Sequence, residues 1–202
     1  MDLSKPISSL IPGATGKALE VLAASRGELS LRTLASLADV SPSQASRVLA
    51  RLVELGIVSR RDVPPVSLFR LNREHLAAPA LEDLRRSAEA LPGRIGELST
   101  AISPPPVTVT LFGSAAESRA TASSDIDVLV VRSEDVDPAD ASWSTSLADF
   151  MESVERLTGN TVNVLEVGEG ELPELLSSPA GVWRAIATDG VTVAGRPLRV
   201  AA

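Results

Sequence analysis

The stretch LFGSAAESRATASSDIDVLVV, residues 111–131, decides the fold of the C-terminal half of this sequence. Its first residues close the apolar run VTVTLF at 107–112, which has the composition of a strand, and DIDVLVV at 125–131 has that of a second strand. Between them Gly113-Ser114 predicts a tight turn, and residues 115–122 have the composition of a short helix. We therefore expect two strands joined by a glycine turn and a short helix.

Asp125 and Asp127 lie at the entrance of the second strand. Side chains alternate along a strand, so both carboxylates should point to one face, about 7 Å apart. Two like charges at this distance repel and are costly beside an apolar strand unless a cation lies between them. Mg²⁺ prefers oxygen ligands, and in proteins it is often bound by one or two carboxylates together with substrate phosphates. Gly113 and Ser114 would let the backbone and a hydroxyl approach those phosphates.

Gly-Ser, ten residues, then Asp-x-Asp resembles the signature of the DNA polymerase β-like nucleotidyltransferases, specifically their minimal branch, over residues 107–195. The resemblance implies that Asp125 and Asp127 are catalytic and hold Mg²⁺ or Mn²⁺, and that Gly113, Ser114 and Ser124 bind the nucleotide. It implies transfer of a nucleoside monophosphate from a nucleoside triphosphate, with release of pyrophosphate. The implied acceptors are protein side chains, RNA ends or an aminoglycoside.

The sequence departs from this family pattern in two places. Glu117 follows Gly-Ser closely, where many members carry a positive charge, and Asn163 lies in the strand expected at 161–167, where a third carboxylate is usual. An amide oxygen can ligate a cation but brings no negative charge. Glu166 is a candidate substitute, although its odd offset from Asn163 places it on the opposite face of a regular strand. The alternative hypothesis is therefore a transcription regulator whose degenerate domain senses a nucleotide or mediates oligomerisation.

Amphipathic segments precede a β-hairpin in the first 75 residues. Apolar residues at helical spacing predict three helices, over 16–25, 30–40 and 41–56. Ser41 and Gln44 have the spacing of a capping box, and Pro42 suits the first helical position, so the third helix should begin there. Two β-prone runs flank Pro64-Pro65 and predict a hairpin with strands at 57–60 and 66–71.

The segment LRTLASLADVSPSQASRVLARLVELGIVSRR resembles the winged helix-turn-helix DNA-binding domain, over about residues 15–73. Polar residues that face outward from the third helix, or lie beside the hairpin turn, are the candidate DNA contacts: Ser43, Gln44, Arg47, Arg51, Arg60 and Arg61. Gln44 and Arg47 would reach the major groove, and the other arginines would contact phosphates. The alternative is a solvated helix face in a domain that binds protein or dimerises.

Charge and composition support two domains. Residues 1–75 carry 10 Lys/Arg against 7 Asp/Glu, a balance of +3, whereas residues 76–202 carry 9 against 19, a balance of −10. The basic part suits polyanions such as DNA and the acidic part suits metal ions. We expect an α/β (α+β) protein: a winged helix-turn-helix domain (1–75), a linker helix (76–105) and a nucleotidyltransferase-like domain with a small mixed sheet (106–202).

The linker has apolar residues spaced alternately by three and four over residues 81–102. This pattern is compatible with a homodimer seam and equally with packing inside one chain. Pro92-Gly93 interrupts the pattern, which implies a kink or two consecutive helices.

Other functions are excluded or weakened by composition. The sequence has no cysteine, which excludes disulfides, thiolate zinc sites and cysteine nucleophiles. His75, the single histidine, lacks partners at catalytic or metal spacing. No segment approaches the roughly 20 apolar residues of a membrane span, and no secretory leader opens the sequence, so we expect a cytoplasmic protein with no membrane partner. A toxin or antitoxin role is a third hypothesis.

Overall fold

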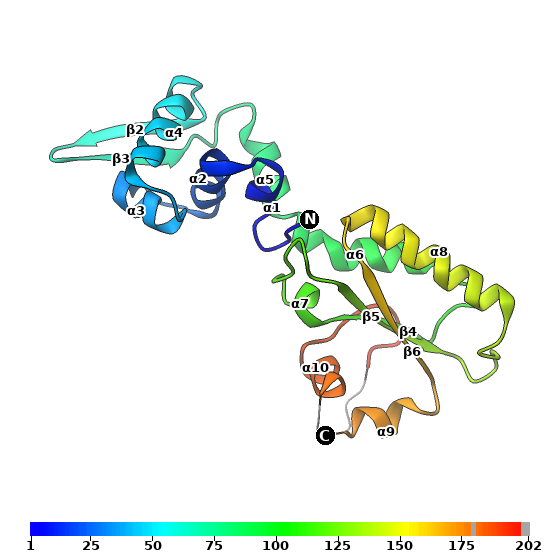
Figure 1. The fold of residues 1–202 in the computed structure, drawn as a ribbon. Helices are drawn as coiled ribbons and strands as arrows, with labels where there is room; N and C mark the ends of the chain where they lie inside the picture. Colours follow the sequence, from blue (N-terminus) through cyan, green and yellow to red (C-terminus); the bar gives the residue numbers. More distant parts are fainter. Residues whose placement is uncertain (179–180, 199–202) are drawn as a thin grey trace. The chain divides into compact units, whose positions relative to one another are not determined.

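The computed structural model describes residues 1–178 and 181–198, which form two compact units. The N-terminal unit comprises residues 5–88. The C-terminal unit comprises Met1–Ser4 and the chain from Glu89 onward (Figure 1). Four residues at the start of the chain therefore belong to the same unit as its second half.

The N-terminal unit combines helices with a small antiparallel sheet. Its helices are α1 (Pro6–Leu10), α2 (Gly13–Ala24), α3 (Leu31–Leu37), α4 (Pro42–Glu54) and α5 (Ala78–Arg85). Its strands pair in the order β1-β3-β2, where β1 is Leu29–Ser30, β2 is Val58–Val63 and β3 is Val66–Leu71. The three expected helices and the hairpin are confirmed. The short elements α1 and β1 were not predicted, because five and two residues show no usable periodicity.

The start of α4 follows from its sequence. Gln44 N donates to Ser41 Oγ at 3.2 Å, Ser41 N donates to Gln44 Oε1 at 3.1 Å, and Pro42 is the first helical residue. This reciprocal pair satisfies backbone N–H groups that the first helical turn would otherwise leave without a partner. The expected capping box is therefore confirmed, and it fixes where α4 begins.

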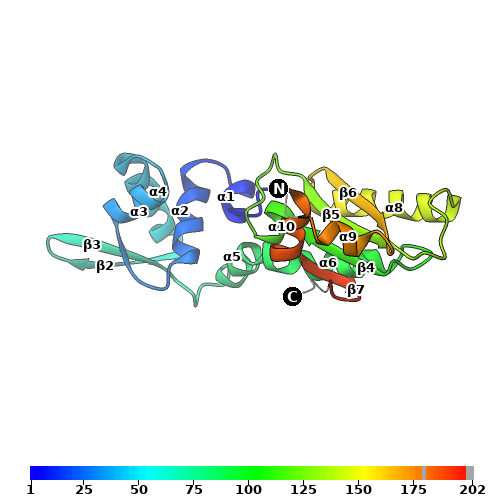
Figure 2. The same cartoon turned by 90° about the horizontal axis from the view of Figure 1, so that it is seen from below.

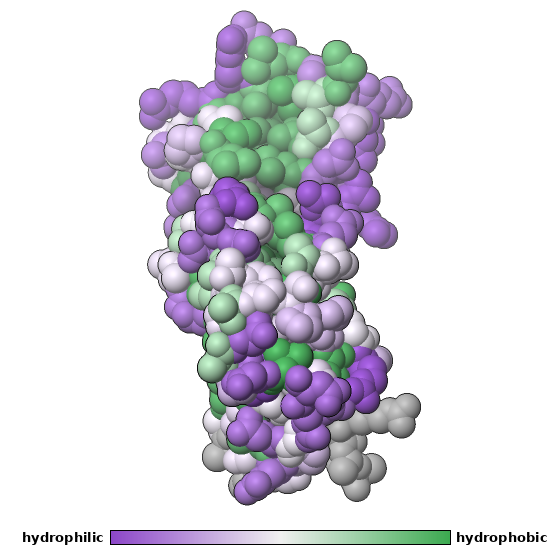
Figure 3. Space-filling model, turned by 90° about the vertical axis from the view of Figure 1, so that its right-hand side faces the viewer, coloured by the Kyte–Doolittle hydropathy of each residue, from purple (hydrophilic) through white to green (hydrophobic). Residues whose placement is uncertain are grey.

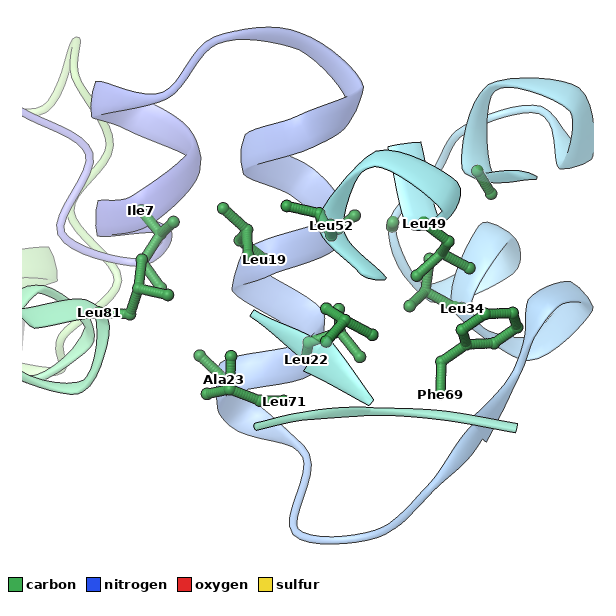
Figure 4. Close-up of a cluster of buried hydrophobic side chains, with 14 of the residues drawn as sticks. Ile7, Leu19, Leu22, Ala23, Leu34, Leu49, Leu52, Phe69, Leu71 and Leu81 are labelled. Atoms are coloured by element: carbon green, nitrogen blue, oxygen red, sulfur yellow. The ribbon is translucent and has the colours of Figure 1, made fainter. Parts of the chain in front are cut away.

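The hydrophobic core of the N-terminal unit joins α1–α5 to the inner face of the hairpin. Figure 4 shows Phe69 beside Leu34 and Leu49 at one end of this core, and Ile7 beside Leu81 at the other. Leu34 and Leu49 are at most 1% exposed. Burial of a leucine contributes about 1.5–3 kcal/mol, so this cluster holds the helices on the sheet.

The C-terminal unit is built on a four-stranded sheet in the order β6-β5-β4-β7. Its strands are β4 (Thr108–Phe112), β5 (Ile126–Arg132), β6 (Val162–Gly168) and β7 (Val191–Gly195). Its helices are α7 (Gly113–Ala116), α8 (Ala141–Thr158), α9 (Leu172–Leu176) and α10 (Val182–Asp189), together with α6 (Ser87–Ser99), which starts at the end of the N-terminal unit. β5 runs parallel to β6, and β4 runs antiparallel to β5 and β7, so the expected mixed sheet is confirmed.

Helices cover both faces of this sheet. Both views show α6 and α8 on one face and α9 and α10 on the other (Figures 1 and 2). Val128, Leu129, Val130 and Val131 are each 0% exposed. A strand enclosed on both faces reads as a continuous apolar run, which explains the sequence of β5.

The structure differs from two local expectations. The helix expected at 115–122 is only α7, because Glu117 already leaves the helical region and Ser118 has a positive φ of 55°. α6 runs through Pro92, so the break between consecutive helices falls at Arg86 instead, and a kink at Pro92 stays a prediction.

Most of the apolar seam of the linker is buried within the chain itself. Its buried members are Leu81, Ala88, Leu91, Ile95 and Ile102. Burial inside one chain favours the intramolecular interpretation, and the homodimer stays a prediction.

The surface mixes polar and apolar residues. On the face drawn in Figure 3, apolar atoms gather in a patch in the upper part of the view, bordered by hydrophilic residues. Among the residues that the structure describes, none of the helices combines the length and the apolar character needed to cross a membrane.

Candidate functional site

The candidate site forms where β4 ends, α7 begins and β5 begins. Phe112 pairs with Asp127 across the two strands, and Gly113 follows with a φ of +68°. A Cβ atom on Gly113 would lie 2.7 Å from Asp127 Oδ2. Both the positive φ and this close approach require glycine, so the backbone of the turn lies directly against the carboxylate.

Asp125, Asp127 and Asn163 meet beside this turn. Asn163 lies opposite Asp127 on the parallel strand β6. Its side-chain nitrogen Nδ2 donates to Asp125 Oδ2 at 3.0 Å and to Asp127 Oδ1 at 3.4 Å. The residues predicted as the catalytic pair and as the weaker third ligand are therefore neighbours in space.

The electrostatics of the pair are unfavourable without a cation. Partial burial raises the pKa of Asp127 above its ordinary value, the hydrogen bond from Asn163 opposes this rise, and the charge of Asp125 adds to it. Within residues 1–178 and 181–198, neither aspartate forms an ion pair with Lys, Arg or His. The only bridging group among those residues is the neutral amide of Asn163.

The loop before Asp125 is held by Asn160, which is only 4% exposed. Asn160 Nδ2 donates to Thr121 O at 3.0 Å and to Ser124 O at 2.8 Å. Ser124 Oγ in turn accepts from Thr121 N at 3.0 Å, so its hydroxyl closes the turn that leads to Asp125. The sequence reasoning missed Asn160, although an asparagine directly after the helix-ending Gly159 is typical of a structured turn.

The first residues of the chain pack on the same loop. Leu3 N donates to Ala120 O at 2.8 Å, and Leu3 is 4% exposed. The amino group of Met1 donates to Asn160 Oδ1 at 2.6 Å. Asn160 therefore links residues 1–4 to the loop that positions Asp125.

Glu117 does not stand alone beside the turn. Arg119 Nε donates to Glu117 Oε2 at 2.8 Å, and Ser114 O accepts from Arg119 N at 2.8 Å. The carboxylate that departs from the family pattern is thus paired with a cation two residues later. Arg119, which the sequence reasoning did not single out, brings a positive charge to this loop.

Glu166 does not join the aspartates. Its Oε1 accepts from Arg132 Nε and from Trp143 Nε1, each at 3.0 Å. Trp143 belongs to α8, on the sheet face opposite α9 and α10. The structure therefore does not bring the proposed substitute ligand to Asp125 and Asp127, because β6 has no bulge in its pairing with β5.

The donor set fits a hard divalent cation. Among the described residues, no group of three or more His, Asp or Glu side chains could hold a metal. Two carboxylates and one side-chain amide nevertheless converge at the Gly113 turn. Mg²⁺ is commonly bound by one or two carboxylates together with substrate phosphates. The oxygen and nitrogen of an amide exchange places by rotation about the terminal bond, so Asn163 can also present its oxygen.

The candidate DNA contacts lie on α4 and on the hairpin of the N-terminal unit. Ser43, Gln44, Arg47 and Arg51 are exposed on α4, as expected. The side-chain oxygen of Gln44 is occupied by the capping box. A base contact by Gln44 would therefore have to use its amide nitrogen or break the cap.

Three of the four candidate arginines are paired with carboxylates. Arg51 Nη1 lies 2.8 Å from Glu54 Oε2, and Arg60 Nε lies 2.9 Å from Asp62 Oδ1. Arg61 Nε donates to Glu28 Oε1 at 2.9 Å, and this contact lowers the pKa of Glu28. Among the described residues, Arg47 forms no ion pair, so its guanidinium is the most available of the set.

Comparisons with known proteins assign both units. Residues 16–62 match the family model described as the IclR helix-turn-helix domain, and residues 95–175 match the nucleotidyltransferase domain. The chain therefore joins an N-terminal helix-turn-helix domain to a C-terminal nucleotidyltransferase domain. Both assignments agree with the resemblances drawn from the residues alone.

Similarity to solved structures is weak. A toxin–antitoxin structure with AMP-PNP is 19% identical, with a TM-score of 0.36, and the match covers 52% of this chain and 73% of that chain. A mutant of the toxin–antitoxin pair MntA–HpeT is 17% identical, with the same TM-score and coverage. TrmBL2, an archaeal chromatin protein that binds DNA, is 16% identical, with a TM-score of 0.32, and the match covers 87% and 75%. A search of curated proteins gave no significant match.

Proposed function

We propose that this chain is a metal-dependent nucleotidyltransferase that moves a nucleoside monophosphate from a nucleoside triphosphate to an acceptor, and that its helix-turn-helix domain binds DNA. The observation that supports this most strongly is the meeting of Asp125, Asp127 and Asn163 beside the Gly113 turn of a nucleotidyltransferase domain. The proposed acceptors are a protein side chain, an RNA end or a small molecule. The chain contains no tyrosine, which excludes modification of its own tyrosines.

Each residue of the site has a distinct role in this proposal. Asp125 and Asp127 would hold Mg²⁺ or Mn²⁺, and the Asn163 amide would add an uncharged oxygen. The bound ion would offset the phosphate charge and stabilise the entering and leaving oxygens. Gly113 lets the triphosphate approach the backbone, and the Ser114 hydroxyl would donate to a phosphate oxygen.

The transfer step forms one bond and breaks one. The acceptor oxygen bonds to the α-phosphorus while the bond from that phosphorus to the α,β-bridging oxygen breaks, and pyrophosphate leaves with the bond's electron pair. Asn163 cannot take up the acceptor's proton as a carboxylate would. Because Asp125 and Asp127 would both bind the cation, neither is free to accept this proton, which would pass to water.

DNA binding is proposed on the exposed surface of α4 and the hairpin. Arg47 would reach base edges in the major groove, whereas Arg51, Arg60 and Arg61 would contact phosphates after releasing their carboxylate partners. Because exposed ion pairs are worth about 0–1 kcal/mol, exchange of a carboxylate for a phosphate costs little.

The test is a calorimetric titration of the full chain with each nucleoside triphosphate, with and without Mg²⁺ or Mn²⁺. We expect metal-dependent binding in the wild type and loss of more than about 100-fold in affinity when Asp125→Asn and Asp127→Asn are combined, because both charged ligands are then neutral. Asp135→Asn, an exposed aspartate outside the site, is the matched control and should bind as the wild type does. Wild-type binding that persists in the double variant would contradict the proposal.

A second candidate function is a DNA-binding regulator whose nucleotidyltransferase domain binds nucleotide without transferring it. The observation that favours it is the uncharged Asn163 at the position of the third ligand. Pyrophosphate release in the presence of an acceptor separates the two functions. Metal-dependent nucleotide binding with no pyrophosphate release from protein, RNA or aminoglycoside acceptors would favour the regulator.

A further inference from the structure

The N-terminal unit contains a cavity of about 730 Å³ between the side of α4 and the inner face of the β2–β3 hairpin. Its lining includes Leu49, Val53, Phe69, Arg32, Arg60 and Ser67. None of these residues belongs to the carboxylate site of the C-terminal unit. The volume lies within the range of about 300–1,000 Å³ that is usual for small-molecule sites.

The floor of this cavity is apolar and rigid. Leu49 is 1% exposed and Phe69 is 5% exposed, so both lie beneath the floor, and its accessible apolar surface comes from Ala50, Val53 and Val66. Figure 4 shows the Phe69 ring beside Leu49 at the end of the core. Val53, one helical turn after Leu49 on α4, is half-buried and extends the same floor. A flat apolar group would therefore meet a preformed surface that needs little rearrangement.

The rim of the cavity carries positive charge. Arg60 and Arg32 both line it, and none of the described lining residues is acidic. Arg60 is engaged, because its Nε lies 2.9 Å from Asp62 Oδ1, which also accepts from Ser67 Oγ at 2.5 Å. Arg32, at the start of α3, is exposed and forms no ion pair or side-chain hydrogen bond within residues 1–178 and 181–198. One guanidinium is therefore available to an anion above an apolar floor.

We propose that this cavity binds a small amphipathic anion: a flat apolar body that packs on Ala50, Val53 and Val66, with a carboxylate or sulfonate held by Arg32. The charge of the rim selects an anion, and the apolar floor selects a ligand with a hydrophobic body. A DNA phosphate would use the charge but would leave the floor empty. The site does not depend on the proposed transferase activity, because no residue is shared.

The test uses two fluorescent probes that differ mainly in one charge: anilinonaphthalene sulfonate, an anion, and its neutral counterpart phenylnaphthylamine. Titration of the full chain should give saturable enhancement with the anion. Arg32→Gln should weaken binding of the anion by about tenfold, as expected for loss of a charge-assisted hydrogen bond, and leave the neutral probe unchanged. Arg26→Gln, which removes an exposed arginine elsewhere in the same unit, should change neither.

A second variant tests whether the apolar part of the ligand binds in this cavity. Ala50 is an exposed lining residue, so Ala50→Trp should fill the cavity without disturbing the core, and both probes should lose their binding. Circular dichroism melting curves check that each variant is folded. Equal anion binding in the wild type and Arg32→Gln, or unchanged binding of both probes in Ala50→Trp, would overturn the proposal. So would an Arg32→Gln variant that loses DNA affinity while its anion binding is unchanged, because the cavity would then be part of a phosphate-contacting surface.

Discussion

In the N-terminal unit Arg51, Arg60 and Arg61 each lie against a carboxylate, whereas in the C-terminal unit Asp125 and Asp127 lie beside each other with only a neutral amide between them. The arginine pairs are on the surface, and their partners include carboxylates that are themselves exposed. The aspartates stand at a turn where backbone and carboxylate are in contact.

The two binding surfaces therefore differ in whether their charged groups already have partners of opposite charge. Arg51, Arg60 and Arg61 already have carboxylate partners. An incoming polyanion must replace those partners, so the binding free energy it gains is only the difference between an arginine–phosphate and an arginine–carboxylate contact. The aspartate pair remains uncompensated, and a cation that binds there gains the full interaction with both carboxylates. The structure is thus better prepared for a cation in the C-terminal unit than for an anion on most of α4.

Among single substitutions, the largest effect is expected when Asn163 is replaced by aspartate. Asn163→Asp adds a third negative charge to the pair, so affinity for Mn²⁺ should rise by roughly ten- to a hundredfold, and the metal-free protein should become less stable. Calorimetric titration with Mn²⁺ and denaturation without metal measure the two changes. Asn163→Ser is the matched variant, since it shortens the side chain without adding charge. Equal metal affinity in Asn163→Asp and wild type would show that Asn163 does not face the cation.

Replacement of Asn160 tests how the loop before Asp125 is held. Asn160→Ala removes hydrogen bonds to Thr121 O and Ser124 O from a buried position, which should lower the free energy of unfolding by about 2 kcal/mol. Hydrogen exchange of residues 119–125 should become faster, while exchange in α4 stays unchanged because it belongs to the other unit. Uniformly faster exchange throughout both units would argue against a local clamp.

The parts predicted from sequence are those whose signals are local. The capping box of Ser41 and Gln44 gave the start of α4, and the apolar run of β5 gave its burial on both faces. Gly113-Ser114 and Asp125-x-Asp127 gave the turn and the carboxylate pair because spacing along the chain determines their approach.

The parts that sequence did not predict depend on contacts between distant segments. Asn160 binds a loop 36 residues earlier in the chain, and Glu166 on β6 accepts a hydrogen bond from Trp143 on α8. A helix was expected at 115–122 because an alanine-rich composition favours one. In the structure the helix ends at Ala116, and Asn160 holds the end of this segment as a loop.

The DNA affinities of two arginine variants test whether a carboxylate partner restrains an arginine of the N-terminal unit. Arg47→Gln should weaken DNA binding by about tenfold, because Arg47 has no competing carboxylate among the described residues and faces outward from α4. Arg61→Gln should cost less than about threefold, because Arg61 must first give up Glu28. Electrophoretic retardation at fixed salt measures both. A larger loss for Arg61→Gln would mean that the pair with Glu28 does not restrain this arginine.

The smallest expected effect is a pH dependence of opposite sign in the two units, measured by denaturation of the full chain without divalent metal. The raised pKa of Asp127 gives a contribution to stability that is present below the ordinary carboxyl value of about 4 and is lost as pH rises through the raised pKa. The lowered pKa values of Glu28 and Asp62 contribute stability above that value, which is lost as pH falls.

Asp127→Asn isolates the first contribution. The variant should gain stability relative to the wild type as pH rises above about 4, and Asp135→Asn should not. Added Mn²⁺ should reverse the order, because the ion binds the ionised pair of the wild type and not the variant. A wild type that is more stable than Asp127→Asn at neutral pH without metal would mean that Asp127 is a structural cap of β5, since the repulsion that a cation relieves would then be absent.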